Sequence, residues 1–593
     1  MGILKLFLLL LLSSIILFCS KLDEYKREAI SLNLYNKHYW HVLLHIRDGV
    51  SEIEDRNFFI AKDGNINPKA ELIATIESFF KSDRDNNSTI CRFPARYYWL
   101  KRELNATFPE ANCKNLNRVL KKVEPVSVTL IFPSAHINTP ASMFGHTFLR
   151  INSSFKSKLL SYAVNYSANV DIDRENGITF AFKGVFGGYY GRFSLLPYYE
   201  KLKEYRDTEQ RDIFEYDLNF TKDETLKIFL HIWELNKIKS RYYFFTNNCS
   251  YNILWLLEAG RDSLRLVDRF SFEVIPLETI HLAKEEGLIK SKSYRASKRR
   301  VLLKYEELID KRYIYIPKKI IEEDINLDEI LKGISLKQQR YILEASIEYL
   351  EYRYIEGEIE KERYLTLFYT LTSKRATLGV GEEIKIKEPP NPLDSHRAVR
   401  FKFGVGDDEV SYFGFRPAYH SLDDRGYGFM QGVSIEFLNF ELGVEKSRAF
   451  VEDITLMGIN SITNISSFFK PISWRAKVGW NRYSRDSSAK FGTTIGGGVS
   501  FGVKSYSFYT LAEPFLYTNG DSGVGLVLGF DFDINRYLDT NFEFNRRVYK
   551  NGDYKSILNF SQGFSPSQNS QILLNYKKNS KEDSLRLYFK YFY

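Results

Sequence analysis

The sequence has little cysteine and, beyond its N-terminus, no long apolar run. Four of its 593 residues are cysteine, and past the N-terminus no apolar stretch reaches the roughly 18 residues that a membrane-spanning helix needs. Lys and Arg number 83 against 74 Asp and Glu and form no block, so no nucleic-acid partner is expected. These absences exclude a helical-bundle membrane protein. A β-barrel is not excluded, because its strands only alternate apolar and polar residues.

Aromatic residues are abundant instead. Phe, Tyr and Trp make up 16% of the chain, hydrophobic residues 44% and charged residues 26%. This composition supplies enough apolar side chains for buried cores and differs from the polar, highly charged composition of disordered chains. At about 150 residues per domain, the length predicts roughly three to five domains.

The first residues are typical of a secretory signal peptide. Lys5 precedes the apolar run 6–18, in the order of a charged and then an apolar signal region. We therefore expect residues 1–19 to be the signal and the mature protein to be exported. Cys19 ends a stretch that resembles a lipobox, at which a cysteine is lipidated, but the bulky Phe18 before it favours an ordinary signal.

An exported chain meets an oxidising compartment, where cysteines tend to pair. Cys91 and Cys113, 22 positions apart in one polar segment, are a candidate disulfide. Such a bond would add about 3 kcal/mol to stability. Cys249 is then left over, and a lone thiol in an exported protein is either buried and inert or a nucleophile.

Changes in residue pattern divide the chain. Apolar positions recur at helical spacing in 70–80, whereas 126–132, 145–151 and 159–166 read as strands. The expected regions are a signal at 1–19, a mainly helical accessory region at 20–120, an α+β domain at 121–290, a helical connector at 291–388 and a β-barrel at 389–593.

The last region has the pattern of membrane-spanning strands. From Val524 to Asn535 every even position is apolar, whereas the odd positions include Gly525, Asp531 and Asp533. Alternation in spans of about 9–11 residues predicts an antiparallel transmembrane barrel of about 10–12 strands in a bacterial outer membrane. A soluble β-sandwich alternates in the same way and is the alternative.

The final residue, Tyr593, falls on the apolar face of the last predicted strand. A terminal aromatic residue resembles the signal by which the barrel assembly machinery recognises its clients. We therefore expect that machinery as a partner during biogenesis. Barrel proteins ordinarily lose their signal without lipidation, which also argues against lipidation of Cys19.

The candidate chemistry centres on Cys249. It follows the polar turn 247–248 and opens a helical pattern over 249–259 that Gly260 is expected to cap. At a helix N-terminus, unpaired N–H groups and the positive end of the dipole favour a thiolate and can hold an oxyanion. The alternative is a buried structural cysteine at a helix end.

A thiol nucleophile needs a base, and His146 is the best-placed histidine because it stands at the start of a predicted strand. If the following hairpin turns between Phe155 and Lys156, Asn165 lies directly opposite His146 on the same face. Asn165 is therefore the candidate orienting residue. His136, in a predicted loop, competes with His146 for the role of base.

Three further histidines, His38, His41 and His45, recur at i, i+3 and i+7. This spacing places them on one face of a helix, which accounts for them without any ligand. A metal site is the alternative, because imidazoles that lie close together can share an ion. We expect no cofactor.

Two motifs in this order resemble a known family. The stretches PASMFGHTF at 140–148 and YYFFTNNCS at 242–250 resemble the periplasmic domain of the Lnb family of lipoprotein intramolecular transacylases. The likeness covers about residues 85–290. The order of His before Asn-Cys is also similar to circularly permuted papain-like enzymes, including the lecithin retinol acyltransferase group. The resemblance implies a permuted papain-like α+β domain with Cys249 as nucleophile and His146 as base, whereas Asn165 rests on position alone.

The resemblance also implies a function. It points to a thiol-dependent acyltransferase at the periplasmic face of the outer membrane, which takes an acyl chain from a lipoprotein or membrane lipid and passes it to an amine. The family's own protein lacks a C-terminal barrel, so the substrate stays open. One alternative is a cysteine hydrolase or amidase acting on peptidoglycan peptides or phospholipid. Another is a non-catalytic barrel, a channel or an anchor, with a binding domain.

Overall fold

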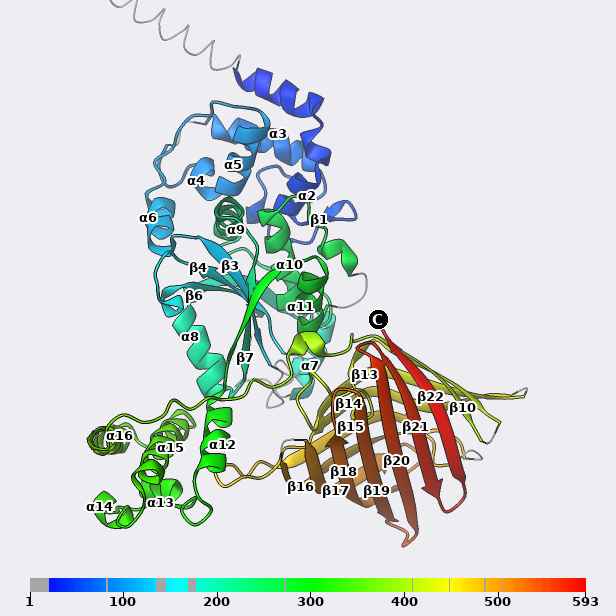
Figure 1. The fold of residues 1–593 in the computed structure, drawn as a ribbon. Coiled ribbons are helices and arrows are strands. Elements are labelled where there is room, and N and C mark those ends of the chain that lie inside the picture. The colour runs from blue at the N-terminus through cyan, green and yellow to red at the C-terminus, as the bar shows by residue number, and fades with distance from the viewer. Residues whose placement is uncertain are drawn as a thin grey trace, which may run out of the picture. The chain divides into compact units, whose positions relative to one another are not determined.

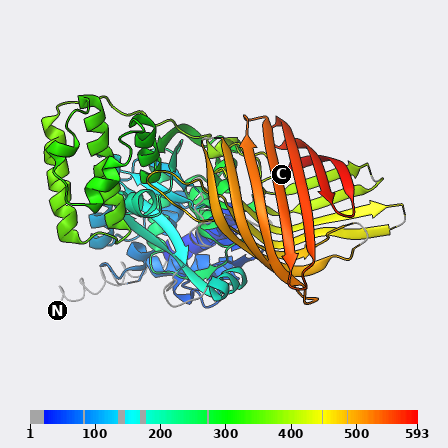
Figure 2. The ribbon, with the colours of Figure 1, turned by 90° about the horizontal axis from the view of Figure 1, so that it is seen from below.

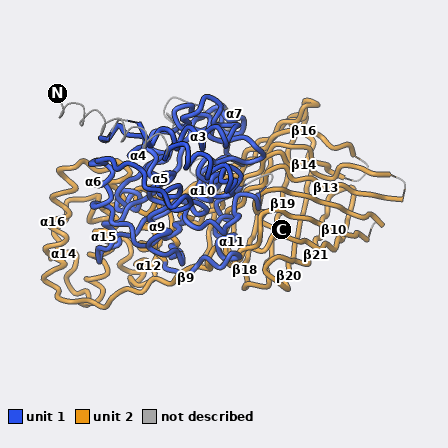
Figure 3. Tube along the Cα trace, turned by 90° about the horizontal axis from the view of Figure 1, so that it is seen from above, with its two compact units in different colours: residues 1–132, 146–203, 215–293 blue, residues 133–145, 204–214, 294–593 orange. Residues whose placement is uncertain are grey.

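The computed structural model (Figure 1) describes residues 21–81, 84–134, 145–168, 177–270, 274–407, 409–446, 448–484, 487–503 and 505–593. The predicted signal with Cys19, the competing base His136 and the motif residues 140–144 lie outside these ranges. Among the described residues, none of the helices combines the length and the hydropathy of a membrane span. The chain divides into two compact units, one of residues 1–132, 146–203 and 215–293 and the other of 133–145, 204–214 and 294–593 (Figure 3).

The first unit begins with a mainly helical accessory region. The predicted helix at 70–80 is present as α3, which starts at 68 because Pro68 suits a first helical position and the Asn67 side chain accepts the Ala70 N–H. The elements are η1 (Leu34–Asn36), α2 (His38–Leu44), β1 (Ile46–Arg47), β2 (Val50–Ser51), η2 (Arg56–Phe58), α3 (Pro68–Phe79), α4 (Thr89–Arg92), α5 (Pro94–Glu103) and α6 (Lys114–Val123).

A seven-stranded sheet forms the centre of the α+β region. Its order is β8-β6-β5-β4-β3-β7-β9, and the neighbours β3/β4, β4/β5, β5/β6 and β6/β8 are antiparallel. The strands are β3 (Ser127–Pro133), β4 (Phe148–Asn152), β5 (Tyr162–Ala168), β6 (Tyr189–Pro197), β7 (Ile213–Leu218), β8 (Ser240–Tyr242) and β9 (Ile289–Arg295). The strand predicted at 145–151 therefore begins later than expected, at Phe148, and His146 lies in the segment before it.

Five helices accompany this sheet: α7 (Gly177–Phe186), α8 (Tyr198–Leu202), α9 (Lys222–Glu234), α10 (Cys249–Gly260) and α11 (Pro276–Glu285). A capping box starts α9, since Thr221 and Glu224 each accept the other's backbone N–H. The expectation that Gly260 caps α10 is wrong, because Gly260 is the last helical residue and Arg261 is the cap. A Cβ on Gly260 would come within 2.8 Å of Ile228, so close packing against α9 explains this glycine.

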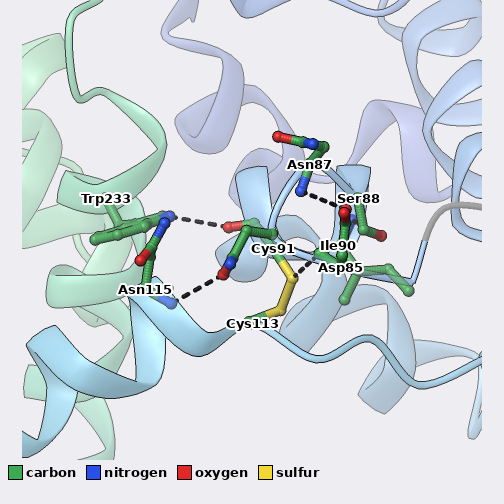
Figure 4. The surroundings of a disulfide bond; sticks show 9 residues. Asp85, Asn87, Ser88, Ile90, Cys91, Cys113, Asn115 and Trp233 are labelled. Carbon is green, nitrogen blue, oxygen red and sulfur yellow. Dashed lines mark hydrogen bonds between the residues drawn. A yellow bond between two sulfur atoms is a disulfide. The ribbon is translucent and has the colours of Figure 1, made fainter.

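Cys91 of α4 and Cys113, just before α6, are joined by a disulfide bond with their Cα atoms 5.2 Å apart (Figure 4). The Trp233 indole N–H of α9 donates to the Cys91 carbonyl at 2.9 Å. The disulfide thereby fastens two accessory helices beside a helix of the α+β region.

The second unit starts with a helical connector. Its core includes Ile320, Ile342 and Leu350, and also Phe468 and Phe469 from the loop between β14 and β15 of the barrel. The helices are α12 (Lys298–Leu308), α13 (Ile316–Glu322), α14 (Leu327–Ile330), α15 (Leu336–Ile355) and α16 (Lys361–Thr377). Two aromatic side chains from a barrel loop therefore complete the core of the connector.

The C-terminal strands form a closed antiparallel barrel (Figure 2). The pairing of β11 with β13 closes a ring of twelve strands, and the short β12 adds to the edge of β13. The strands are β10 (Arg400–Gly406), β11 (Ser411–Arg416), β12 (Ala418–His420), β13 (Val433–Glu445), β14 (Arg448–Ser461), β15 (Ser473–Asn481), β16 (Lys490–Val503), β17 (Tyr506–Tyr517), β18 (Ser522–Asp533), β19 (Leu538–Tyr549), β20 (Tyr554–Ser567), β21 (Ser570–Asn579) and β22 (Asp583–Phe592).

The predicted alternation in β18 matches the two faces of the barrel wall. Val524 and Leu526 are half exposed on the outer face, whereas Val527 and Asp531 are buried inside. Gly529 also faces inward, where a Cβ would collide with the Tyr509 ring at 1.9 Å. An apolar outer face and a polar interior are typical of a transmembrane barrel and not of a soluble sandwich.

Candidate active site

Cys249 is the first residue of α10, and its buried thiol is free. Asn248 fixes this end of the helix. Its side-chain oxygen accepts the N–H groups of Ser250 and Tyr251 at 3.0 and 3.1 Å, and its amide group donates to the Val274 carbonyl at 2.5 Å. The thiol therefore has a defined position at a helix N-terminus.

The structure brings His146 to this thiol. Helix α10 packs against β4 and β5, and His146 lies two residues before β4. Burial alone would raise the pKa of Cys249, but the charge of His146, a hydrogen bond from its ring and the Thr147 backbone N–H lower that pKa to about 6. At neutral pH most of the thiol is therefore ionised, as a nucleophile requires.

Asn165 holds the other side of the imidazole. Its Oδ1 lies 2.6 Å from His146 Nε2, and the residue is buried in β5. An amide oxygen only accepts, so Nε2 donates to Asn165 and Nδ1 is the ring nitrogen left for exchanging a proton with the thiol. The expected direct pairing across the hairpin is wrong, because the ladder pairs Leu149 with Val164 and the turn is centred one residue later. The two side chains meet diagonally instead.

Tyr242 of β8 is a site residue that the sequence reasoning did not single out. Burial and the charge of Cys249 raise the pKa of Tyr242 far above its ordinary value, and its hydroxyl hydrogen-bonds to the Cys249 side chain. The ring stacks on Tyr166, with centroids 5.9 Å apart. Tyr242 opens the YYFFTNNCS motif, but nothing in the sequence shows that β8 brings it back to the helix start.

The accessory region forms hydrogen bonds with α10 near both ends of the helix. Glu52, just after β2, accepts the Tyr251 hydroxyl at 2.7 Å and the Trp255 indole N–H at 2.9 Å. At the other end, the Tyr39 hydroxyl donates to the Ala259 carbonyl at 2.6 Å. The accessory region is therefore part of the support that positions Cys249.

The histidines at i, i+3 and i+7 do not converge on a metal site. They lie in and just after α2 and point to three different partners, which separates their ring nitrogens. His38 faces Glu258 Oε2 at 3.2 Å, His41 the Tyr35 carbonyl at 2.9 Å and His45 the His231 Nε2 at 3.0 Å.

One other histidine cluster lies inside the barrel. His396, His420 and Asp424 place their ligand atoms within 4.8 Å of one another. Asp424 is already 2.6 Å from Arg416 and 3.0 Å from Lys590, both fully buried. A metal ion would be repelled by these cations, so we interpret the cluster as an internal ion-pair network.

Comparison with protein families supports the division of the chain. Residues 115–286 match the Lnb N-terminal periplasmic domain. Residues 32–103, 292–386 and 389–592 match three domains of unknown function, DUF7843, DUF7842 and DUF7840. No curated protein matches the chain.

Similar solved structures include outer-membrane proteins. The chain is 11% identical to a KdgM porin over 33% of its own length and 98% of that protein, with a TM-score of 0.23. The NanC porin shows 10% identity over 33% and 100%, with a TM-score of 0.24. The outer membrane channel DcaP of Acinetobacter baumannii shows 8% over 33% and 95%, with a TM-score of 0.18.

Because these TM-scores are low, the barrel assignment rests on the strand pairing and faces of this chain itself. The fold and the family match together define a class, an outer-membrane β-barrel that carries an Lnb-type periplasmic domain. The protein resides in the outer membrane, with that domain in the periplasm.

Proposed function

We propose that this protein is a thiol-dependent acyltransferase that acts on lipoproteins or membrane lipid through a Cys249 acyl-thioester. One observation carries the proposal: Asn165, His146 and Cys249 stand in a hydrogen-bonded line that lowers the thiol pKa to about 6. The order nucleophile, base and orienting amide is that of papain-like enzymes, and we assign the Lnb-like region to their circularly permuted form.

The reaction follows from this geometry in two halves. His146 Nδ1 takes the thiol proton, the thiolate attacks the acyl carbonyl, and the ester C–O bond breaks while the leaving alkoxide takes the proton from His146. An amine then attacks the thioester, the C–S bond breaks, and its excess proton returns the thiolate to the thiol through His146. The products are a lyso-lipid and an N-acylated acceptor.

Fewer backbone N–H groups are available to an oxyanion than the start of a helix ordinarily offers. Asn248 already accepts the N–H groups of Ser250 and Tyr251. The Cys249 backbone N–H hydrogen-bonds to the Tyr242 hydroxyl, so it reaches a developing oxyanion only when that bond is given up. Tyr242, protonated because its pKa is high, is a hydroxyl donor beside the sulfur.

The test uses the full chain in lipid nanodiscs with a diacylated lipoprotein as both donor and acceptor. We expect a Cys249 acyl-thioester that neutral hydroxylamine cleaves, and a mass gain at the lipoprotein α-amine. Cys249→Ala should abolish both. His41→Gln, which changes an imidazole that among the described residues hydrogen-bonds to the Tyr35 carbonyl alone, is the matched control and should keep full turnover.

Two results would redirect the proposal. Full turnover by Cys249→Ala on lipoprotein, phospholipid and cell-wall substrates would remove the nucleophile assignment. Release of free fatty acid or cleaved peptide, with no acylated amine even when an acceptor is present, would identify a cysteine hydrolase instead.

A further inference from the structure

The two ends of the barrel face different compartments. Arg400 at the start of β10 pairs with Phe592 at the end of β22, so the chain enters and leaves the barrel at the same end. The Lnb-type domain and the connector precede that entry, which makes it the periplasmic end. The opposite end, with the turns at 518–521, 550–553 and 580–582, faces the cell exterior.

Buried ion pairs lie in the lumen near its periplasmic end. Asp424 contacts Arg416 and Lys590, and all three are at most 1% exposed. The Phe592 ring stacks on His396 at 3.8 Å and adds an apolar layer beside these ion pairs. Side chains therefore occupy part of the lumen at this end.

The lumen also contains a cavity of about 480 Å³, which reaches from Glu436 and Asn460, near the periplasmic ends of β13 and β14, to Lys581 in the turn between β21 and β22. Among its described lining residues seven side chains are basic and three acidic. The acidic Glu513 and Glu543 are both engaged by Arg475, at its two guanidinium nitrogens. The remaining basic groups therefore set the charge of the cavity.

Three of those basic groups have no carboxylate within ion-pair distance among the described residues. They are Arg547, Lys555 and Lys581, all of which line the cavity. Arg547 donates to the Tyr517 hydroxyl at 2.6 Å, and Lys555 lies over the Tyr549 ring at 4.7 Å. Both heads are held in place by neutral groups, and among the described residues no carboxylate lies within ion-pair distance of either.

Such a cluster favours an anion. Lys490 and Lys581 lie close enough to Lys555 to repel it, whereas Asp521, which pairs with Lys490, and Asp553 attract it from a distance. Bound carboxylate or phosphate oxygens would relieve this repulsion by charge-assisted hydrogen bonds. The amides of Asn481, Asn545 and Asn559 line the same cavity and suit the hydroxyl groups of a sugar.

We propose that this cavity is a binding cup for an acidic saccharide that reaches it from outside the cell. Its carboxylate or phosphate pairs with Arg547, Lys555 and Lys581, which line the exterior part of the cavity, and its hydroxyl groups bond to the lining amides. This site is independent of the Cys249 chemistry.

The experiment is calorimetric titration of the full chain in nanodiscs. The ligands are trigalacturonate, glucose 6-phosphate, neutral maltotriose and inorganic phosphate. We expect at least one acidic sugar to bind at least tenfold more tightly than maltotriose and than inorganic phosphate, and to weaken as salt rises. The double variant Arg547→Gln with Lys555→Gln should lose at least tenfold in affinity.

The matched control is Lys578→Gln, which removes a positive charge that is exposed and paired with Asp583. It should bind as the unchanged protein does. Heat-modifiable migration on gels verifies that each variant keeps a folded barrel. Three results would each overturn the proposal. The double variant could bind the acidic sugar as tightly as the unchanged protein does. The unchanged protein could bind maltotriose, or inorganic phosphate, as tightly as it binds the acidic sugars.

Discussion

The Oδ1 atom of Asn165 lies 2.6 Å from Nε2 of His146, although the two residues are not opposite each other in any strand pair. His146 stands before β4, whereas Asn165 is inside β5 and pairs with Ser194 of β6. The contact is therefore made by side chains across a diagonal. It uses the Nε2 proton and leaves Nδ1 for exchanging a proton with the thiol of Cys249.

Asn165→Ala should lower kcat about 10²-fold and leave KM nearly unchanged, because the base stays present but loses its orientation and tautomer. Steady-state acyl transfer measures both constants. Ser194→Ala is the control, since that hydroxyl donates only to the Asn165 backbone carbonyl at 3.3 Å. A variant Asn165→Ala with wild-type kcat would show that the contact has no catalytic role.

The reactivity of Cys249 should rise as pH passes through about 6, because its lowered pKa leaves the thiolate as the main form above that value. In His146→Gln the charge that lowers the pKa is gone and burial remains, so the midpoint should move above pH 8. The pH dependence of iodoacetamide alkylation measures this midpoint.

The other described cysteines do not interfere with that measurement, because Cys91 and Cys113 are oxidised. His41→Gln serves as the control and should keep the midpoint near 6. An unchanged midpoint in His146→Gln would contradict the assigned thiol and imidazole pair.

Glu52→Gln should destabilise the first unit by about 1–3 kcal/mol and lower kcat, because one amide oxygen cannot replace two carboxylate oxygens that accept from Tyr251 and Trp255. The midpoint of thermal unfolding by Trp fluorescence and the acyl-transfer rate measure the two effects. Glu54→Gln removes an exposed ion pair with Arg241 and should change stability by less than about 0.5 kcal/mol. Equal behaviour of the two variants would refute the support role of Glu52.

Replacing Cys91 and Cys113 with Ser should lower stability by about 3 kcal/mol, because the unfolded chain regains the entropy of a 22-residue loop. Denaturant unfolding of the periplasmic region, followed by Trp fluorescence, should show an earlier transition. Reductant should shift the unchanged protein to the same midpoint and leave the double variant unaffected. If reductant shifts neither, the disulfide does not form in the mature protein.

Much of the fold could be predicted because its signals are local. The alternation from Val524 to Asp533 sorts side chains to two faces within one strand, and the Asn248-Cys249 boundary marks a helix start by capping chemistry alone. The start of the strand predicted at 145–151 and the role of Gly260 were mispredicted. In both cases the outcome depends on a contact between residues distant in sequence. The pairing of β4 with β3 sets where the strand starts, and the close approach of Ile228 requires a glycine at 260.

The sequence by itself determined the outer-membrane barrel, the lone thiol at a helix start and the order of the two motifs, because periodicity and capping act over a few residues. Only the tertiary structure decided that Asn165 reaches His146, that Tyr242 and Glu52 support Cys249, and that buried ion pairs lie beside a cavity inside the barrel. Those outcomes depend on which side chains contact each other across strands and helices. The residues in these contacts are tens to hundreds of positions apart in the sequence, so only the folded chain brings them together.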